Sequence, residues 1–233
     1  MTPRTALITG ASRGLGRALA TALSAEGWQL VLDARDGDRL ATTVAALPAP
    51  QRVTALAGDV ADPAHRAALA AAVPGRLDLL VSNASELGPS PLPGLADLHI
   101  EDFERVLAVD TVAPLALFQS VLPALLAAGG QVLHVSSDAA VEAYAGWGGY
   151  GAAKAALDQL TAVLGVEHPE LRVHVVDPGD MATDLHQAAF PGEDISDRPA
   201  PETVVPALLA LIEGDRPSGR YRAAELLAEG AAR

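Results

Sequence analysis

The chain lacks cysteine and contains few aromatic residues. None of its 233 residues is Cys, and only 3% are Phe, Trp or Tyr. Without cysteine the protein can form neither disulfides nor thiolate metal sites, which is typical of the reducing cytoplasm, where we expect it to reside. Its six histidines show no metal-ligand spacing, so we expect no metal site.

Basic residues are also in the minority. The 16 Lys and Arg residues are outnumbered by 29 Asp and Glu residues, which gives a net charge of −13. Such a charge disfavours nucleic acid and anionic membranes as partners. The N-terminus shows no signal-peptide pattern, and no run of about 18 uncharged apolar residues suggests a membrane span. We therefore expect neither a nucleic acid nor a membrane as partner.

Half of the residues are hydrophobic, and short apolar runs alternate with longer helical patterns. The runs predict strands at 4–9, 28–33, 52–57, 77–81, 131–136 and 171–176, with a short seventh at 220–221. The helical patterns cover 14–26, 38–47, 63–73, 98–128, 150–166 and 202–213. This alternation predicts an α/β fold, a doubly wound parallel sheet of about seven strands with helices on both faces.

Three glycines fall within residues 9–16, directly after the first predicted strand. Gly10 can supply a tight turn, Gly14 can let a phosphate approach the backbone, and Gly16 can let the helix pack on the strand. Free N–H groups at the helix N-terminus would then face an anion. The spacing Gly-x-x-x-Gly-x-Gly differs from the general dinucleotide fingerprint, so a glycine turn without a ligand remains an alternative.

The second predicted strand ends in charged residues roughly 20 positions after the glycines, where dinucleotide-binding folds contact the adenosine ribose. A carboxylate there binds the ribose 2′-hydroxyl, whereas a guanidinium binds a 2′-phosphate. The sequence offers both, as Asp33 and Arg35. For each of them an ordinary surface charge is the alternative.

A second group of candidate residues lies near the middle of the chain. Tyr150 and Lys154 are four residues apart on one face of a predicted helix, and Ser137 ends the preceding strand. A free phenol has a pKa of about 10, and a nearby ammonium group lowers that pKa. Tyr-x-x-x-Lys alone is more often a solvated pair. Its combination with the serine and the glycine turn favours a catalytic site.

With these motifs the chain resembles the short-chain dehydrogenase/reductase family, over roughly residues 4 to 215. The motifs agree in order and spacing from the glycine turn to Pro178-Gly179 and Thr183. The resemblance implies a single Rossmann-type NAD(P)-binding domain over residues 1–233, with a substrate loop at about 184–200. It also implies an oxidoreductase that interconverts a carbonyl and an alcohol by hydride transfer.

The resemblance assigns cofactor contacts position by position. The phosphate turn would comprise Gly10, Ser12, Arg13, Gly14, Leu15 and Gly16. Further contacts would come from Asp59, Val60, Asn83, Ala84, Tyr150, Lys154, Pro178, Gly179, Met181 and Thr183. Family members that prefer NADP(H) often carry bases at the positions of Arg13 and Arg35, so the resemblance implies NADP(H) rather than NAD(H). Asp33 falls one position too early in this mapping, and we interpret it as a strand-end charge.

The resemblance also assigns catalytic roles. Tyr150 would exchange a proton with the substrate, Ser137 would polarise the carbonyl, and Lys154 would bind the nicotinamide ribose and lower the tyrosine pKa. A fourth catalytic position, an asparagine in the family, is Asp110 here. This residue could pair with Lys154, or it could weaken the proton relay. Two other departures are Ser85 in place of a glycine and the thin final strand at 220–221.

The expected substrate is a small carbonyl compound or alcohol, and its identity is not predicted. Wall residues would be Glu86, Asp138, Tyr144, Trp147 and the segment 184–195. We expect His134 to pack in the core and His186 to be exposed. The helix at 150–166 has apolar surface beyond what the sheet requires, which suggests a partner helix. The family resemblance implies that it joins the helix at 98–128 in a subunit interface, so we expect a homodimer or homotetramer.

Three other functions are compatible with the sequence. The protein could bind NADP(H) without turnover, as a sensor or scaffold, and the departure at Asp110 is the feature that favours this. It could use the same Tyr and Lys as an epimerase or dehydratase. A Rossmann-type methyltransferase is the third, although the Ser-Tyr-Lys set would have no purpose there.

Overall fold

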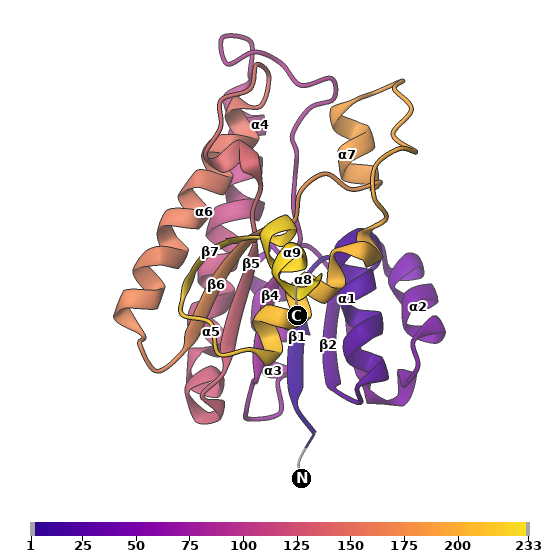
Figure 1. The fold of residues 1–233 in the computed structure, drawn as a ribbon, viewed down its shortest axis with the longest axis vertical. Helices are drawn as coiled ribbons and strands as arrows, with labels where there is room; N and C mark the ends of the chain where they lie inside the picture. The colour runs from indigo at the N-terminus through magenta and orange to yellow at the C-terminus, as the bar shows by residue number, and fades with distance from the viewer. Residues whose placement is uncertain (1–2, 232–233) are drawn as a thin grey trace.

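The computed structural model describes residues 3–231, which form a sheet of seven strands with helices on both faces (Figure 1). The strand order is β3-β2-β1-β4-β5-β6-β7, and every neighbouring pair is parallel. The bounds are β1 Thr5–Ile8, β2 Gln29–Ala34, β3 Val53–Ala57, β4 Leu79–Ser82, β5 Gln131–Val135, β6 Arg172–Asp177 and β7 Gly219–Arg222. The prediction of a doubly wound parallel sheet is confirmed.

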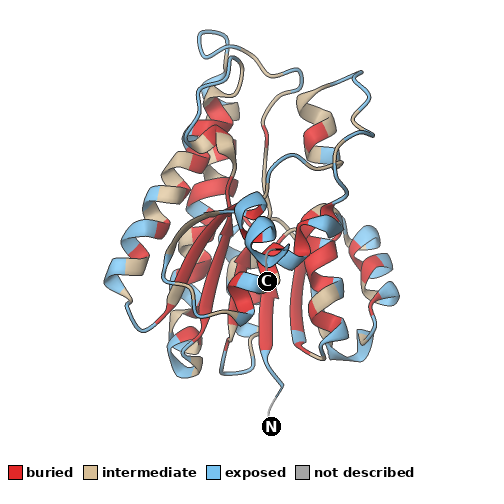
Figure 2. Ribbon diagram, in the orientation of Figure 1, coloured by how far each residue is buried: buried red, intermediate tan, exposed pale blue. Residues whose placement is uncertain are grey.

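The helices divide between the two faces of the sheet. Their bounds are α1 Gly14–Ala25, α2 Gly37–Ala46, α3 Pro63–Ala71, α4 Ile100–Leu107, α5 Ala113–Ala128, α6 Gly148–Glu167, α7 Asp184–Ala189, α8 Val205–Glu213 and α9 Ala223–Ala231. Short 3₁₀ turns lie at Pro50–Arg52, Asp138–Ala140 and Pro201–Thr203. One core cluster joins α1, α2, α8 and α9 to one sheet face, and another joins α3, α5 and α6 to the opposite face. Between them β1, β2, β4, β5 and β6 are buried over almost their whole length, whereas the edge strands β3 and β7 are partly exposed (Figure 2).

The helix predicted at 98–128 is interrupted. A π-helical turn at Ala108–Val112 separates α4 from α5. Pro114 has no N–H to donate to the carbonyl of Asp110, and its ring crowds that carbonyl, which favours the wider turn. The turn carries Asp110 into the interior, where its residue surface is 1% exposed.

The helical stretch Ile100–Ala128 also corrects one expectation. It contains an 18-residue window with a mean hydropathy of 1.7, long and apolar enough by those criteria to cross a membrane, and a third of that window is buried in the fold. Leu117, Phe118 and Leu125 of α5 pack in the core beneath the sheet. The run of uncharged residues was therefore present in the sequence, and one of its faces packs against the sheet.

Two helices near the C-terminus were not predicted. Helix α7 forms within the segment that we expected to be a loop, and the Thr183 hydroxyl caps it by accepting from the His186 N–H at 3.2 Å. Helix α9 follows β7 directly. The final strand, although short, pairs with β6 over four residues, from His174 with Gly219 to Asp177 with Arg222.

Candidate active site

The strand order reverses between β1 and β4, and a cavity of about 430 Å³ opens at the carboxyl ends of the strands. Ligands bind at such reversal points in open α/β sheets. All the predicted cofactor residues except Gly16 line this cavity, and so do Ser137, Tyr150 and Lys154. The fold therefore brings together segments that lie between residues 10 and 186 of the sequence.

Each glycine of the first turn is required for a different structural reason. Gly10 has a φ of +67°, and a Cβ there would lie 2.8 Å from Ala84 Cα. A Cβ on Gly16 would lie 2.5 Å from the Gly10 carbonyl oxygen, so the helix could not approach the turn. Gly14 has a φ of +53°, and only the Thr183 side chain would face its Cβ, at 3.5 Å. Gly10 and Gly16 thus allow close packing, whereas Gly14 faces the open cavity.

The buried Asp33 side chain at the end of β2 contacts the backbone of this turn. One carboxylate oxygen accepts from the Gly10 N–H at 3.0 Å, and the other lies 2.8 Å from His65 Nε2. Burial raises the pKa of Asp33, although the contacts with Gly10 and His65 act in the opposite direction. Our interpretation of Asp33 as a strand-end surface charge is therefore wrong, because its side chain is buried and holds the backbone of the turn.

Asn83 has a comparable structural role across the turn. Its side-chain amide donates to the carbonyls of Thr9 at 2.9 Å and Gly10 at 3.1 Å. Its backbone N–H and that of Ala84 both donate to the Thr9 hydroxyl. The turn after β1 is therefore fixed by side chains from β2 and from the end of β4.

Four arginines line the cavity, and each pairs with a carboxylate. Arg13 and Arg39 both contact Asp184, at 2.6 and 2.9 Å. Arg35 contacts Glu86 at 2.8 Å, and Arg105 contacts Asp59 at 2.6 Å. The sequence analysis singled out Arg13 and Arg35 but missed Arg39 and Arg105, because helix residues far from a motif carry no local signal.

Tyr150 and Lys154 lie one turn apart on α6, and both are buried. The Lys154 ammonium lies 5.4 Å from the centre of the Tyr150 ring and donates to the Val135 carbonyl at 3.0 Å. Gly151 lets this helix approach the segment after Ser137, since a Cβ there would lie 2.5 Å from the Ala139 carbonyl oxygen. The Ser137 hydroxyl donates to Asp138 at 2.9 Å. Ser137, Tyr150 and Lys154 therefore line the same cavity, whereas the fourth predicted catalytic residue, Asp110, is not among the described residues that line it.

Asp110 forms a buried ion pair with Lys154, with Oδ1 2.8 Å from Nζ. The same oxygen accepts from the Ser85 hydroxyl at 2.5 Å, and the other accepts from the Glu86 N–H at 3.0 Å. Two departures from the family pattern, Ser85 and Asp110, are thus in direct contact. The structure therefore shows the ion pair with Lys154 that the sequence analysis considered for Asp110.

The protonation of Tyr150 reflects these neighbours. Burial raises the pKa of Tyr150, the Lys154 ammonium lowers it, the Asp110 carboxylate raises it, and the net direction is upward. Burial lowers the pKa of Lys154, but Asp110 and Tyr150 outweigh that effect and raise it. The ammonium therefore acts on the phenol in the expected direction, but its effect is smaller than that of burial.

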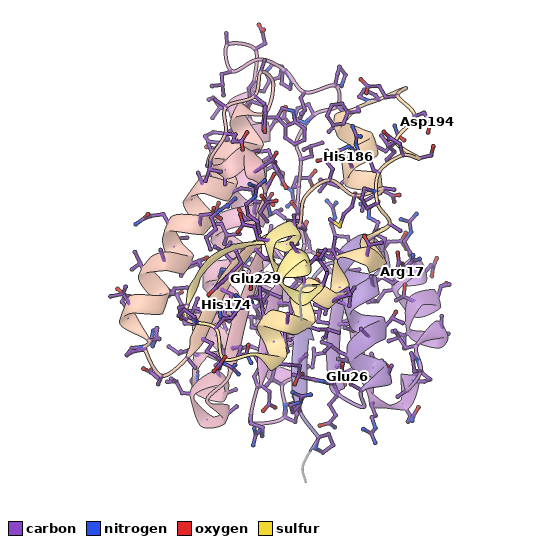
Figure 3. The ribbon with its side chains drawn as sticks, viewed as in Figure 1. Arg17, Glu26, His174, His186, Asp194 and Glu229 are labelled. Atoms are coloured by element: carbon purple, nitrogen blue, oxygen red, sulfur yellow. The ribbon has the colours of Figure 1, made fainter. Side chains whose placement is uncertain are left out.

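Trp147, Leu185 and His186 also line the cavity, where we expected the wall of a substrate site. The Trp147 ring lies 5.8 Å from the Tyr150 ring and 6.0 Å from the Phe190 ring, and His186 stacks on Phe190 at 4.9 Å. Figure 3 marks His186 on α7. The expectation that His186 would be exposed is wrong, because helix α7 turns it inward, where the residue is 8% exposed.

Of the four single residues expected in the wall of the substrate site, two line the cavity and two do not. Asp138 and Trp147 line the cavity, but within residues 3–231 its lining includes neither Tyr144 nor Glu86. The Tyr144 hydroxyl contacts Glu142 and Asp138 near the surface, and Glu86 contacts Arg35. His134 is buried and lies 2.9 Å from the Thr161 hydroxyl, so its assignment to the core is confirmed.

Arg220 of β7 is a functional candidate that the sequence analysis missed. Its guanidinium donates to the Ser137 carbonyl at 3.0 Å and to Asp158 of α6 at 2.9 Å. It also lies 3.6 Å from Asp177 of β6, which accepts from the Gly179 N–H. One side chain therefore ties together the segments that carry Ser137, Tyr150 and the Pro178-Gly179 turn. The pairing of β7 with β6 places Arg220 next to these segments, and no local sequence motif indicates that pairing.

Comparisons with known proteins agree with this site. The family model described as short chain dehydrogenase matches residues 4–194. Rat sepiapterin reductase is 34% identical over 199 residues, covering 78% of this chain and 76% of the relative. Galactitol 2-dehydrogenase of Agrobacterium fabrum is 32% identical over 183 residues, covering 76% and 70%. The chain spans 64% of the length of another relative, the short chain dehydrogenase asqE of Emericella nidulans, with 33% identity.

Solved structures are similar over nearly the whole chain. A Shigella flexneri protein complexed with NADP has a TM-score of 0.88 at 27% identity, covering 96% of this chain and 98% of the other. An alcohol dehydrogenase of Thermococcus sibiricus complexed with 5-hydroxy-NADP has a TM-score of 0.84 at 27% identity, covering 95% and 96%. The chain belongs to the short-chain dehydrogenase/reductase family, whose members are NAD(P)-dependent oxidoreductases.

The contacts of Arg220 generate a prediction. Arg220→Met should lower kcat of the nicotinamide-linked reaction about tenfold or more, because a small displacement of Ser137 and α6 misaligns the reacting groups. Arg220→Lys, which can still reach one carboxylate, should recover part of kcat. Steady-state kinetics give kcat and KM for both variants.

The matched control is Arg222→Met on the same strand. The Arg222 side chain is 55% exposed, against 26% for Arg220, and its one ion pair within residues 3–231 is with Asp177, at 3.8 Å. This variant should retain kcat. Wild-type kcat in Arg220→Met would show that the guanidinium does not position the site.

Proposed function

We propose that this protein is an NADP(H)-dependent oxidoreductase that interconverts a small carbonyl compound and its alcohol. One observation carries the proposal: a buried phenol and a buried ammonium line, together with Ser137, the cavity that begins at the glycine turn, and the buried Asp110 carboxylate pairs with the ammonium. We propose further that residues 1–233 form one catalytic domain, that the segment at about 184–200 contacts the substrate, and that the protein acts in the cytoplasm.

The residues around the glycine turn fit a dinucleotide. The open space at Gly14 and the N-terminus of α1 suit a pyrophosphate. Arg13 and Arg35 offer guanidinium groups for a 2′-phosphate, and the NADP complexes of the Shigella and Thermococcus proteins support that choice. The contacts proposed for the adenosine and nicotinamide ends remain those named from the family resemblance, from Asp59 to Thr183.

In this proposal the chain supplies proton transfer and orientation. The bound nicotinamide supplies or accepts the hydride. Tyr150 gives its proton to the substrate oxygen during reduction and takes it back during oxidation. The Ser137 hydroxyl, which now donates to Asp138, turns toward the same oxygen and stabilises its developing negative charge. Lys154 orients the ribose and moderates the tyrosine pKa.

The alternative of a sensor without turnover depended on the departure at Asp110. The ion pair with Asp110 keeps Lys154 buried beside Tyr150, and Ser137 lines the same cavity. Because the departure leaves these three groups together, the geometry favours an enzyme. An epimerase or dehydratase would need the same Tyr and Lys, and the substrate panel described next separates these reactions from simple reduction.

A panel of ketones, aldehydes and alcohols tests the proposed reaction. Turnover should be linked to the nicotinamide absorbance, with a higher kcat/KM for NADPH than for NADH. Tyr150→Phe should abolish reduction, because the ring remains but the exchangeable proton is lost, while NADPH still binds. Undiminished turnover in Tyr150→Phe would contradict the assigned role. Conversion of a substrate without net oxidation or reduction would indicate the epimerase or dehydratase alternative.

The Asp110 carboxylate generates a prediction about pH. Asp110 raises the pKa of Tyr150, and Lys154 lowers it. Asp110→Asn removes the first influence and leaves the ammonium uncompensated, so the tyrosine pKa should fall. Oxidation requires the phenolate, so its acidic limb should move to lower pH. Reduction requires the phenol, so its alkaline limb should move in the same direction. Profiles of kcat against pH measure both, and two unmoved limbs would contradict the argument.

We also propose a homodimer or homotetramer through the helices at 98–128 and 150–166. The exposed apolar side chains that support it include Val112, Leu126, Val163 and Val166, the last of which is 81% exposed. Such exposed apolar side chains on neighbouring helices are typical of an interface.

Light scattering coupled to size-exclusion chromatography tests this assembly. The wild-type protein should elute with the mass of a dimer or tetramer, and Val166→Asp should shift it toward a monomer, because a buried charge would disrupt the interface. Leu227→Asp, on α9 outside the proposed interface, is the control and should leave the mass unchanged. A monomeric wild-type protein would refute the proposal.

A further inference from the structure

Asp184 lies where three elements around the cavity meet. Its Oδ2 atom is 2.6 Å from Arg13 Nη1 and 2.9 Å from Arg39 Nη1. Arg13 precedes α1 at the glycine turn, Arg39 lies in the first turn of α2, and Asp184 is the first residue of α7. Figure 1 shows α7 above the ends of α1 and α2. All three residues line the cavity.

Two guanidinium groups that converge on a single oxygen form a built anion site. The Asp184 carboxylate supplies one negative charge against their two positive charges, and they lower its pKa. A second carboxylate, that of Asp36, lies 3.9 Å from Arg39, and Arg35 forms a separate pair with Glu86. Two guanidinium groups thus face two carboxylates, and of the two Asp184 makes the shorter contacts and the only ion-pair contact with Arg13 among the described residues.

The Asp184 carboxylate is a weak occupant of this site. The side chains of Arg13, Arg39 and Asp184 are all about half exposed to solvent. Ion pairs between such exposed groups contribute little to stability. A phosphate monoester carries nearly two charges and three acceptor oxygens, and it can accept from both guanidinium groups at once. A phosphate delivered to this place would therefore compete favourably with the carboxylate.

We propose that Asp184 competes with the 2′-phosphate of NADP(H) for Arg13 and Arg39, which makes Arg39 and Asp184 determinants of cofactor specificity. This inference rests on the proposed preference for NADP(H) and adds two residues to it. Arg39 supplies a second guanidinium beside Arg13. NADPH can contact the two arginines with its 2′-phosphate only by displacing the Asp184 carboxylate, which lowers its net affinity. NADH has no 2′-phosphate, so its binding does not require this displacement.

Equilibrium titration with NADPH and NADH tests the competition without any substrate. Quenching of the fluorescence of Trp147, which lines the cavity, reports binding. Arg39→Gln should weaken NADPH about tenfold or more, the loss expected for a charge-assisted contact, and leave NADH unchanged. Asp184→Asn keeps the shape but removes the competing charge, so it should tighten NADPH several-fold and leave NADH unchanged.

The matched control is Arg17→Gln. Arg17 lies on α1 outside the cavity (Figure 3), and in the described part of the chain its side chain forms a single ion pair, with Glu202 at 3.8 Å. It should change neither affinity. If the wild type binds NADH as tightly as NADPH, the proposed cofactor preference fails. If the wild type prefers NADPH but Arg39→Gln and Asp184→Asn alter both affinities equally, or alter neither, the preference stands and this inference is wrong.

Discussion

The buried ion pair between Lys154 and Asp110 constrains the whole site. A charge removed from water is costly unless a partner and further hydrogen bonds compensate it. Compensation here requires α6, the π-helical turn before α5 and the segment after β4 to converge, since Ser85 and the Glu86 N–H complete the shell of Asp110. The same convergence sets Tyr150 against the cavity wall. The placement of the proposed catalytic residues and the compensation of the buried charge are therefore one structural requirement.

A second set of buried polar contacts fixes the opposite side of the cavity. Asp33 accepts from Gly10, and Asn83 donates to the Gly10 carbonyl, so the turn after β1 is held from both neighbouring strands. The strand order makes this possible, because β1 lies between β2 and β4. Unpaired backbone groups at such a turn would cost free energy if buried. Side chains satisfy those on the inner side, and the N–H groups at the start of α1 face the cavity.

The sequence predicted what depends on local pattern. Apolar runs located six strands and a short piece at 220–221 the seventh, and spacing singled out Ser137, Tyr150 and Lys154 as candidates, because a strand end and a single helical turn set their positions. The inward orientation of Asp33 and the reach of Arg220 to Ser137 depend on which strands are adjacent, and no local pattern encodes that. His186 was misjudged for a related reason. A six-residue helix in a segment rich in Pro and Gly has too little periodicity to be predicted, and that helix turns the ring inward.

Arginines are concentrated at the cavity although the protein as a whole is acidic. The chain carries a net charge of −13, yet four arginines line the cavity, and each has a carboxylate partner. These partners come from different segments: Glu86 after β4, Asp59 after β3, and Asp184 at the start of α7. Pairing keeps the arginine side chains extended over the cavity, which reduces the entropy lost when an anion binds them. It also means that an anionic ligand must displace these carboxylates from the arginines before it can bind them. Binding strength then depends on the difference between two sets of contacts, and through that difference the proposed function gives acids outside the glycine motif a part in the choice of cofactor.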